Sequence, residues 1–119
     1  VRKEMTVKAG QKCTAIRRIF VPEEKLEATW TAIAQALQQT VIGDPRHEKV
    51  RMGALAGQSQ RDEVRGQVQK LLSASELVYG SLDSATLLEG DYERGAFLSP
   101  LLLVNHDPFH TPVVHDVEA

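Results

Sequence analysis

The segment Met5–Val21 has the sequence MTVKAGQKCTAIRRIFV and contains Cys13, the only cysteine among the 119 residues of the chain. The residues up to Lys8 are helix formers that predict the last turns of a helix, and Gly10 permits the tight turn that ends it. Ile16–Val21 is rich in β-branched and aromatic residues, which predicts a strand. Cys13 is therefore expected on a short loop between a helix and a strand.

A cysteine on such a loop can act as a nucleophile. Its thiolate can add to a carbonyl carbon, and backbone N–H groups nearby can stabilise the oxygen of the tetrahedral adduct. A lone cysteine is more often a small buried hydrophobe, but Cys13 stands among polar residues. Four cations close in sequence would favour the thiolate if they faced it: Lys8, Lys12, Arg17 and Arg18. Of the two adjacent arginines, we expect one to be solvated and one to be satisfied by partners in the protein.

The hexapeptide Gly10–Ala15, GQKCTA, resembles the catalytic cysteine motif of the aldehyde dehydrogenase superfamily. Within that superfamily, residues 9–19 (AGQKCTAIRRI) are most similar to the dehydrogenases of phenylacetic acid degradation. The other segments that carry the resemblance are Ile42–Pro45, Met52–Leu55 with Ala54 in place of the usual proline, Phe97–Val104, and Val117–Ala119. The last of these resembles the beginning of the family's Glu-x-Phe-Gly-Pro signature. The resemblance thus extends over the whole chain but over only part of a family member.

The resemblance implies that Cys13 is the catalytic nucleophile and that Glu118 binds the ribose hydroxyls of the cofactor, NAD or NADP. It implies oxidation of an aldehyde to a carboxylate through a thiohemiacetal and a thioester. The implied substrate is a small aldehyde, a CoA-linked semialdehyde of phenylacetate breakdown in the most similar members, and the implied assembly is a homo-oligomer. In the family, the general-base glutamate, the oxyanion asparagine and the dinucleotide-binding domain precede this segment. Because such groups act as a unit, we expect the chain alone to be inactive.

Composition limits the class of protein. The chain is long enough for one hydrophobic core and does not begin with Met, so one domain that is part of a larger protein is expected. The resemblance implies that residues 1–119 are a single partial catalytic domain of an aldehyde dehydrogenase. Its 14 basic and 16 acidic residues are spread out, which indicates neither a nucleic-acid partner nor a membrane surface. The longest apolar run, Leu101–Val104, is far too short to span a bilayer. A single cysteine excludes an intrachain disulfide framework and favours a reducing, cytoplasmic location.

Hydrophobic periodicity predicts two amphipathic helices. The first runs from Pro22 to Gln39, and the second begins at Ser59. Their apolar stripes are Leu26, Trp30, Ile33, Ala34 and Leu37 in the first helix, and Val64, Val68, Leu71 and Leu72 in the second. Loops are expected over residues 43–57 and, with acidic side chains exposed, over residues 82–95.

Strands are expected at Ile16–Val21, Glu76–Tyr79 and Leu101–Val104. Strand followed directly by amphipathic helix is half of a βαβ unit. We therefore predict an α/β fold, with a mainly parallel sheet covered by the two helices. By the resemblance, this corresponds to the three-layer α/β/α catalytic domain of aldehyde dehydrogenases.

The histidines of the tail do not form a convincing metal site. Pro108 and Pro112 exclude a regular helix with His106 and His110 on one face, and the spacing matches no recognised set of ligands. We expect no metal. Two alternatives to the enzyme remain: a noncatalytic α/β interaction module in which Cys13 is structural, and a thiol redox sensor in which Cys13 is exposed with a low pKa.

Overall fold

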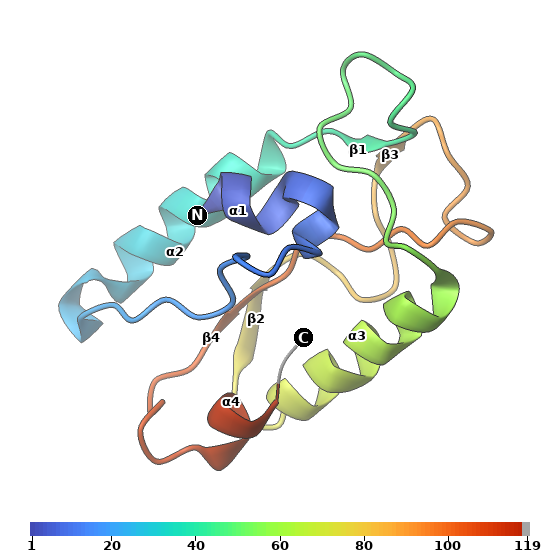
Figure 1. The fold of residues 1–119 in the computed structure, drawn as a ribbon. Helices are drawn as coiled ribbons and strands as arrows, with labels where there is room; N and C mark the ends of the chain where they lie inside the picture. The colour runs from blue at the N-terminus through green and yellow to red at the C-terminus, as the bar shows by residue number, and fades with distance from the viewer. Residues whose placement is uncertain (118–119) are drawn as a thin grey trace.

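The structure is a computed structural model that describes residues 1–117 (Figure 1). Its α-helices are α1 (Arg2–Thr6), α2 (Leu26–Gln38), α3 (Gln58–Leu71) and α4 (Pro112–Asp116). Its strands are β1 (Ile42–Gly43), β2 (Glu76–Tyr79), β3 (Leu87–Leu88) and β4 (Leu102–Val104). Short 3₁₀ turns, η1 (Val7–Gly10) and η2 (Glu23–Lys25), follow α1 and precede α2. None of the described helices is long and apolar enough to cross a membrane.

The strands form two small sheets. β1 and β3 pair in parallel, with Ile42 opposite Leu87. β2 and β4 pair antiparallel, with Leu77 opposite Leu103 and an irregularity between Leu77 and Tyr79. The α/β class is confirmed, but the parallel arrangement predicted for β2 and β4 is wrong. A parallel pair needs a long crossover, usually helical, and the connection between these strands is a loop that contains only β3.

The predicted strand Ile16–Val21 is not formed. The segment is extended but has no backbone ladder within residues 1–117. Its apolar side chains remain accessible, with Ile16 38%, Ile19 41% and Phe20 65% exposed. A preference for β structure reflects packing against a partner strand more than an intrinsic property of the backbone. Without a described partner, the segment keeps an extended shape and makes its contacts through side chains.

The two predicted amphipathic helices are confirmed. α2 begins after Pro22 and η2, buries Leu37 almost completely, and packs against β2 and β4. α3 buries Val68 from its apolar stripe. In Figure 1 the β2–β4 pair is drawn between α2 and α3. Of the two helices, α2 is the one that contacts this sheet, and α3 contacts α4.

A second packed region forms around β1. Ile42, Met52 and Phe97 make a buried cluster, and Ala9, Leu87 and Tyr92 pack against it. The contact with Ala9 brings η1, and with it the chain that leads to Cys13, onto this cluster. Burial of apolar side chains gives the short strands a stability that their few backbone hydrogen bonds could not provide.

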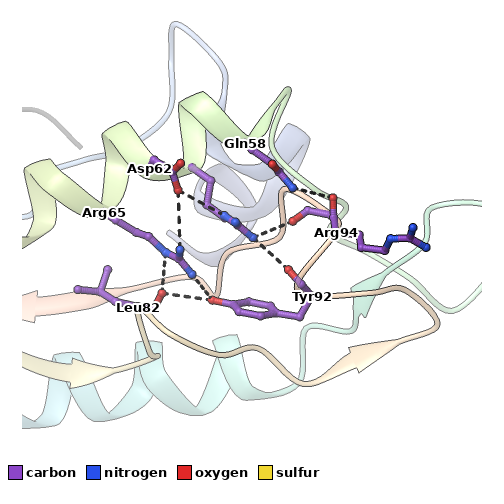
Figure 2. Close-up of polar contacts among 8 residues, drawn as sticks. Gln58, Asp62, Arg65, Leu82, Tyr92 and Arg94 are labelled. Atoms are coloured by element: carbon purple, nitrogen blue, oxygen red, sulfur yellow. Dashed lines mark hydrogen bonds and ion pairs between the residues drawn. The ribbon is translucent and has the colours of Figure 1, made fainter.

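The loop 82–95 is held to α3 by two arginines (Figure 2). Arg61, which is buried, donates from NH1 to the carbonyl oxygens of Tyr92 (3.0 Å) and Gly95 (2.8 Å). Arg65 donates to the Leu82 carbonyl (2.8 Å) and to the Tyr92 hydroxyl (2.6 Å). Both guanidinium groups lie within 6 Å of the Tyr92 ring centroid, at 5.7 and 5.8 Å, a cation–π distance. The acidic residues of the loop are exposed, as predicted. Tyr92 anchors the loop to α3.

The turn after β1 carries a perturbed carboxyl group. The side chain of Arg46 donates to Asp44, as does the Arg46 backbone N–H (2.9 Å), and these bonds lower the pKa of Asp44 from 3.8 to about 2. A lowered pKa in the folded state stabilises the protein above the ordinary pKa of Asp, and this contribution is lost as the pH falls through about 2.

Arg46→Ala is expected to raise the pKa of Asp44 toward 3.8, since both the side-chain hydrogen bond and the nearby positive charge are removed. NMR titration of the carboxyl carbon measures this pKa. Arg51→Ala is the matched control, because the Arg51 guanidinium donates to the backbone carbonyls of Glu48 and Val50 instead. An Asp44 pKa that stays near 2 in Arg46→Ala would contradict this assignment.

Candidate active site

Cys13 follows a tight left-handed turn. Lys8 and Ala9 have φ of 52° and Gly10 has φ of 76°. A positive φ was expected only for Gly10; the two non-glycine residues before it carry no sequence signal for this conformation. The turn is closed by hydrogen bonds from the Gln11 N–H to the Lys8 carbonyl (3.0 Å) and from the Lys12 N–H to the Gly10 carbonyl (2.9 Å). The helix thus ends abruptly and the chain leaves it in a new direction.

Cys13 itself is a free, exposed thiol. It lies in a turn in which the Ala15 N–H donates to the Lys12 carbonyl (3.0 Å). The loop position predicted for Cys13 is therefore confirmed, although the element that follows is not a strand. An exposed thiol does not agree with the interpretation of Cys13 as a small buried hydrophobe.

Two of the cations expected to favour a thiolate are engaged elsewhere. Lys12 Nζ lies 3.8 Å from the Glu4 carboxylate, and the Arg18 guanidinium donates to backbone carbonyls of the tail. Within residues 1–117, no cluster of three or more His, Cys, Asp or Glu side chains could hold a metal ion.

An apolar cavity of about 880 Å³ borders the cysteine loop. Gly10, Gln11, Ala15 and Ile16, on either side of Cys13, contribute to its wall. The cavity continues past apolar side chains of α2, α3 and β4 and reaches Val114 and Val117 in the tail. Cys13 is not itself part of the wall.

The tail folds back on itself and ends in a short helix. α4 begins at Pro112, so His106 and His110 do not share a helix face, as the prolines indicated. His110 Nδ1 lies 2.8 Å from Asp107 Oδ1, and His115 Nε2 lies 2.6 Å from the Pro108 carbonyl oxygen. Glu118, the residue proposed to bind the cofactor, lies outside the described residues.

Arg18 joins the extended segment after Cys13 to this tail. Its Nε donates to the Val114 carbonyl (2.9 Å), and its NH2 group donates to the carbonyls of His115 and Val117 (both 3.2 Å). Arg17 is exposed and makes no hydrogen bond with residues 1–117. The expectation of one satisfied and one solvated arginine is confirmed. The sequence did not show which arginine would find partners or what the partners would be.

Known proteins resemble this chain in sequence and in fold. Residues 1–117 match the Aldehyde dehydrogenase family model. The 3,4-dehydroadipyl-CoA semialdehyde dehydrogenase of Aromatoleum evansii is 38% identical over 116 residues, which are 98% of this chain and 22% of that protein. The sulfoacetaldehyde dehydrogenase of Neptuniibacter caesariensis is 28% identical over 100 residues, 84% of this chain and 20% of the relative. The chain therefore spans about a fifth of the length of these relatives.

Solved structures of aldehyde dehydrogenases have the same fold over this region. The Mycobacterium tuberculosis aldehyde dehydrogenase complexed with NAD⁺ superposes with a TM-score of 0.79 at 22% identity, covering 94% of this chain and 22% of that one. A mutant of aldehyde dehydrogenase C from Pseudomonas syringae, complexed with NAD⁺ and octanal, gives a TM-score of 0.74 at 22% identity, covering 94% and 23% of the two chains. Family match, relatives and fold agree: this chain belongs to the aldehyde dehydrogenase family.

Proposed function

We propose that this chain is the nucleophile-bearing part of an NAD(P)-dependent aldehyde dehydrogenase, in which Cys13 attacks the aldehyde. The observation that carries the proposal is a free, exposed thiol on a tight turn, in a loop whose flanking residues line an apolar cavity, in a chain of this family. The left-handed residues before Cys13 end the preceding helix, so the thiol is presented on a loop and is not packed into the helix.

The chemistry assigned to Cys13 is covalent. Its thiolate forms a C–S bond to the carbonyl carbon, and the carbonyl π electrons move to the oxygen. Backbone N–H groups of the cysteine turn are candidates to stabilise that oxygen. Collapse of the thiohemiacetal with loss of hydride leaves a thioester, and water then releases the carboxylate and restores the thiol.

The nicotinamide nucleotide, when bound, accepts the hydride that leaves the former carbonyl carbon. The cavity of about 880 Å³ falls within the usual size of small-molecule pockets and extends from the cysteine loop to Val117. We propose that the nicotinamide ring would occupy this cavity and that Glu118 would bind the ribose hydroxyls.

For the substrate, we propose a semialdehyde linked to coenzyme A, as in phenylacetate breakdown. The support is the 38% identity to a 3,4-dehydroadipyl-CoA semialdehyde dehydrogenase over 98% of the chain. A cytoplasmic location and a homo-oligomeric assembly are proposed with it, on the basis of cysteine usage and of the family.

The test is aldehyde-dependent formation of NADH or NADPH by a longer polypeptide that contains this sequence. We expect reduction with a CoA-linked semialdehyde, weaker reduction with the free semialdehyde, and none with the 119-residue chain alone. A folded longer polypeptide that reduces neither nucleotide with any aldehyde would overturn the proposal.

A thiol redox sensor is the second candidate, because the same exposed thiol favours it. In that case peroxide would oxidise Cys13 to a sulfenic acid and would itself be reduced to water, and a small thiol such as glutathione could then convert the sulfenic acid to a mixed disulfide with loss of water. Nucleotide reduction would be absent in the longer polypeptide, which distinguishes the two candidates.

A further inference from the structure

One hydrogen bond attaches the cysteine loop, residues 8–15, to a distant part of the fold. The Ala56 backbone N–H donates to Gln11 Oε1 at 3.1 Å, across 45 positions of sequence. Within residues 1–117, the other hydrogen bonds of this loop are local in sequence, such as that from the Ala15 N–H to the Lys12 carbonyl. The Gln11 side chain therefore gives the cysteine loop its directional link to the body of the protein.

Gln11 is held at its backbone as well as at its side chain. Its N–H donates to the Lys8 carbonyl (3.0 Å) and helps to close the left-handed turn. A backbone N–H can only donate, so the bond from Ala56 requires the oxygen of the Gln11 amide to face it. The amide is thus fixed in direction, and Gln11 lies in the wall of the apolar cavity.

The other end of this bond is firmly held. Ala56 lies just before the start of α3. The Leu55 N–H beside it donates to the Ala96 carbonyl (2.8 Å). Gln58, the first residue of α3, donates from its side chain to the loop 82–95 (Figure 2). The cysteine loop is therefore connected to a segment that has its own attachments on both sides of Ala56.

The thiol itself has little else to hold it in place. Cys13 and Thr14 are exposed, so burial contributes little to their position. Packing of Ala9 on the buried cluster fixes the beginning of the loop. Gln11 is nearer to Cys13 in sequence than Ala9 is, and a hydrogen bond restrains direction as well as distance.

We propose that Gln11 is a positioning residue that holds the cysteine loop in the orientation in which Cys13 attacks the aldehyde. The inference rests on the proposed function, in which Cys13 is the nucleophile. A nucleophile reacts fast only when it is held close to the carbonyl carbon and in line with it, and a small displacement costs rate. Loss of the Gln11 bond slows formation of the thioester but leaves the intrinsic reactivity of the thiol unchanged.

The test is the first turnover of nucleotide reduction by the longer polypeptide, mixed with excess nucleotide and a CoA-linked semialdehyde. Gln11→Met keeps the length of the side chain but replaces the amide oxygen by a thioether, a much weaker acceptor. The first-turnover rate constant is expected to fall about tenfold, the kinetic equivalent of one lost hydrogen bond. The amplitude should stay unchanged. A variant that only folded less well would show a smaller amplitude with the same rate constant.

Two further variants test the same bond. Gln11→Asn keeps the amide but withdraws it by one methylene group, so it should slow the first turnover as Gln11→Met does. Ala56→Pro removes the N–H donor and should also slow it. Combined with Gln11→Met, Ala56→Pro should add less than about twofold, because two changes that break one bond are not additive.

Two controls separate positioning from other effects. Gln69→Met makes the same chemical change at an exposed residue of α3 and should leave the rate constant within about twofold. The rate of Cys13 alkylation by iodoacetamide should be the same in Gln11→Met as in the unsubstituted protein, because this small reagent needs no fixed orientation of the loop.

The outcomes are distinguishable. An unchanged rate constant in Gln11→Met, a loss of amplitude alone, or additive effects of Gln11→Met and Ala56→Pro would overturn the positioning role while leaving the proposed function standing. An unsubstituted polypeptide that reduces neither nucleotide with any aldehyde would overturn both. If Gln11→Met fails to fold, Gln11→Asn carries the test: a lower rate constant at full amplitude supports the inference, and an unchanged rate constant contradicts it.

Discussion

Cys13→Ser in the longer polypeptide is expected to abolish aldehyde-dependent nucleotide reduction, with kcat falling at least about a thousandfold. A thiol ionises far more readily than a hydroxyl, and the thiolate is the nucleophile. The expected change lies in kcat, because serine keeps the size and position of the side chain. Steady-state rates with a CoA-linked semialdehyde and saturating nucleotide measure it.

Two controls accompany this variant. Nucleotide binding by Cys13→Ser should be unchanged, which shows that the cofactor site is intact. Thr14→Ser changes the exposed neighbour in the same turn and should retain kcat within about twofold, as surface substitutions usually have small effects. Retention of most of the activity by Cys13→Ser would contradict the nucleophilic role.

Gly43→Ala is expected to produce the largest loss of stability, about 3 kcal/mol, which is the upper end of the usual cost of overpacking. A Cβ at this position would lie 1.9 Å from the Leu88 carbonyl oxygen and 2.8 Å from the Leu88 carbonyl carbon. Both are backbone atoms, so relief requires β1 and β3 to separate. Thermal unfolding of the 119-residue chain, followed by circular dichroism, should show a Tm about 10 °C lower.

Gly66→Ala is the matched control within the same protein. Gly66 lies inside α3, and a Cβ there would meet nothing within 4 Å. Alanine in a helix interior is favoured over glycine by roughly 0.5–1 kcal/mol, so this variant should be slightly more stable. Equal unfolding midpoints for the two variants would contradict the close approach of β1 to β3.

The two amphipathic helices and the longer strands could be predicted because their signal is local, whereas α4 was not predicted. α2 and α3 follow from apolar residues at helical spacing, and β2 lies at the predicted Glu76–Tyr79. β1 and β3 have two residues each, which is too few for any periodicity to show. Their pairing also depends on the close approach of Gly43 to the Leu88 backbone, which only glycine permits. Ile16–Val21 shows the opposite case, a β-prone sequence without a partner strand among the described residues.

In the candidate site, too, some features could be predicted from the sequence and others could not. The loop position of Cys13 could be predicted because its flanking residues are polar and include Gly10, whereas its role as the nucleophile stays a prediction. The anchoring of Tyr92 by Arg61 and the attachment of Arg18 to the tail could not be predicted. Most of the acceptors are backbone carbonyls, which every residue carries, and for Arg18 they lie 96 to 99 positions away in sequence.

The most direct test is to find the covalent intermediate on the sulfur. The longer polypeptide is mixed with nucleotide and a CoA-linked semialdehyde, stopped with acid during the first turnover, digested and analysed by mass spectrometry. A peptide containing Cys13 that carries the mass of the acyl group, and that is absent when the nucleotide is omitted, is the predicted result. An acyl group on a different residue, or nucleotide reduction with Cys13 unmodified throughout the turnover, would contradict the account.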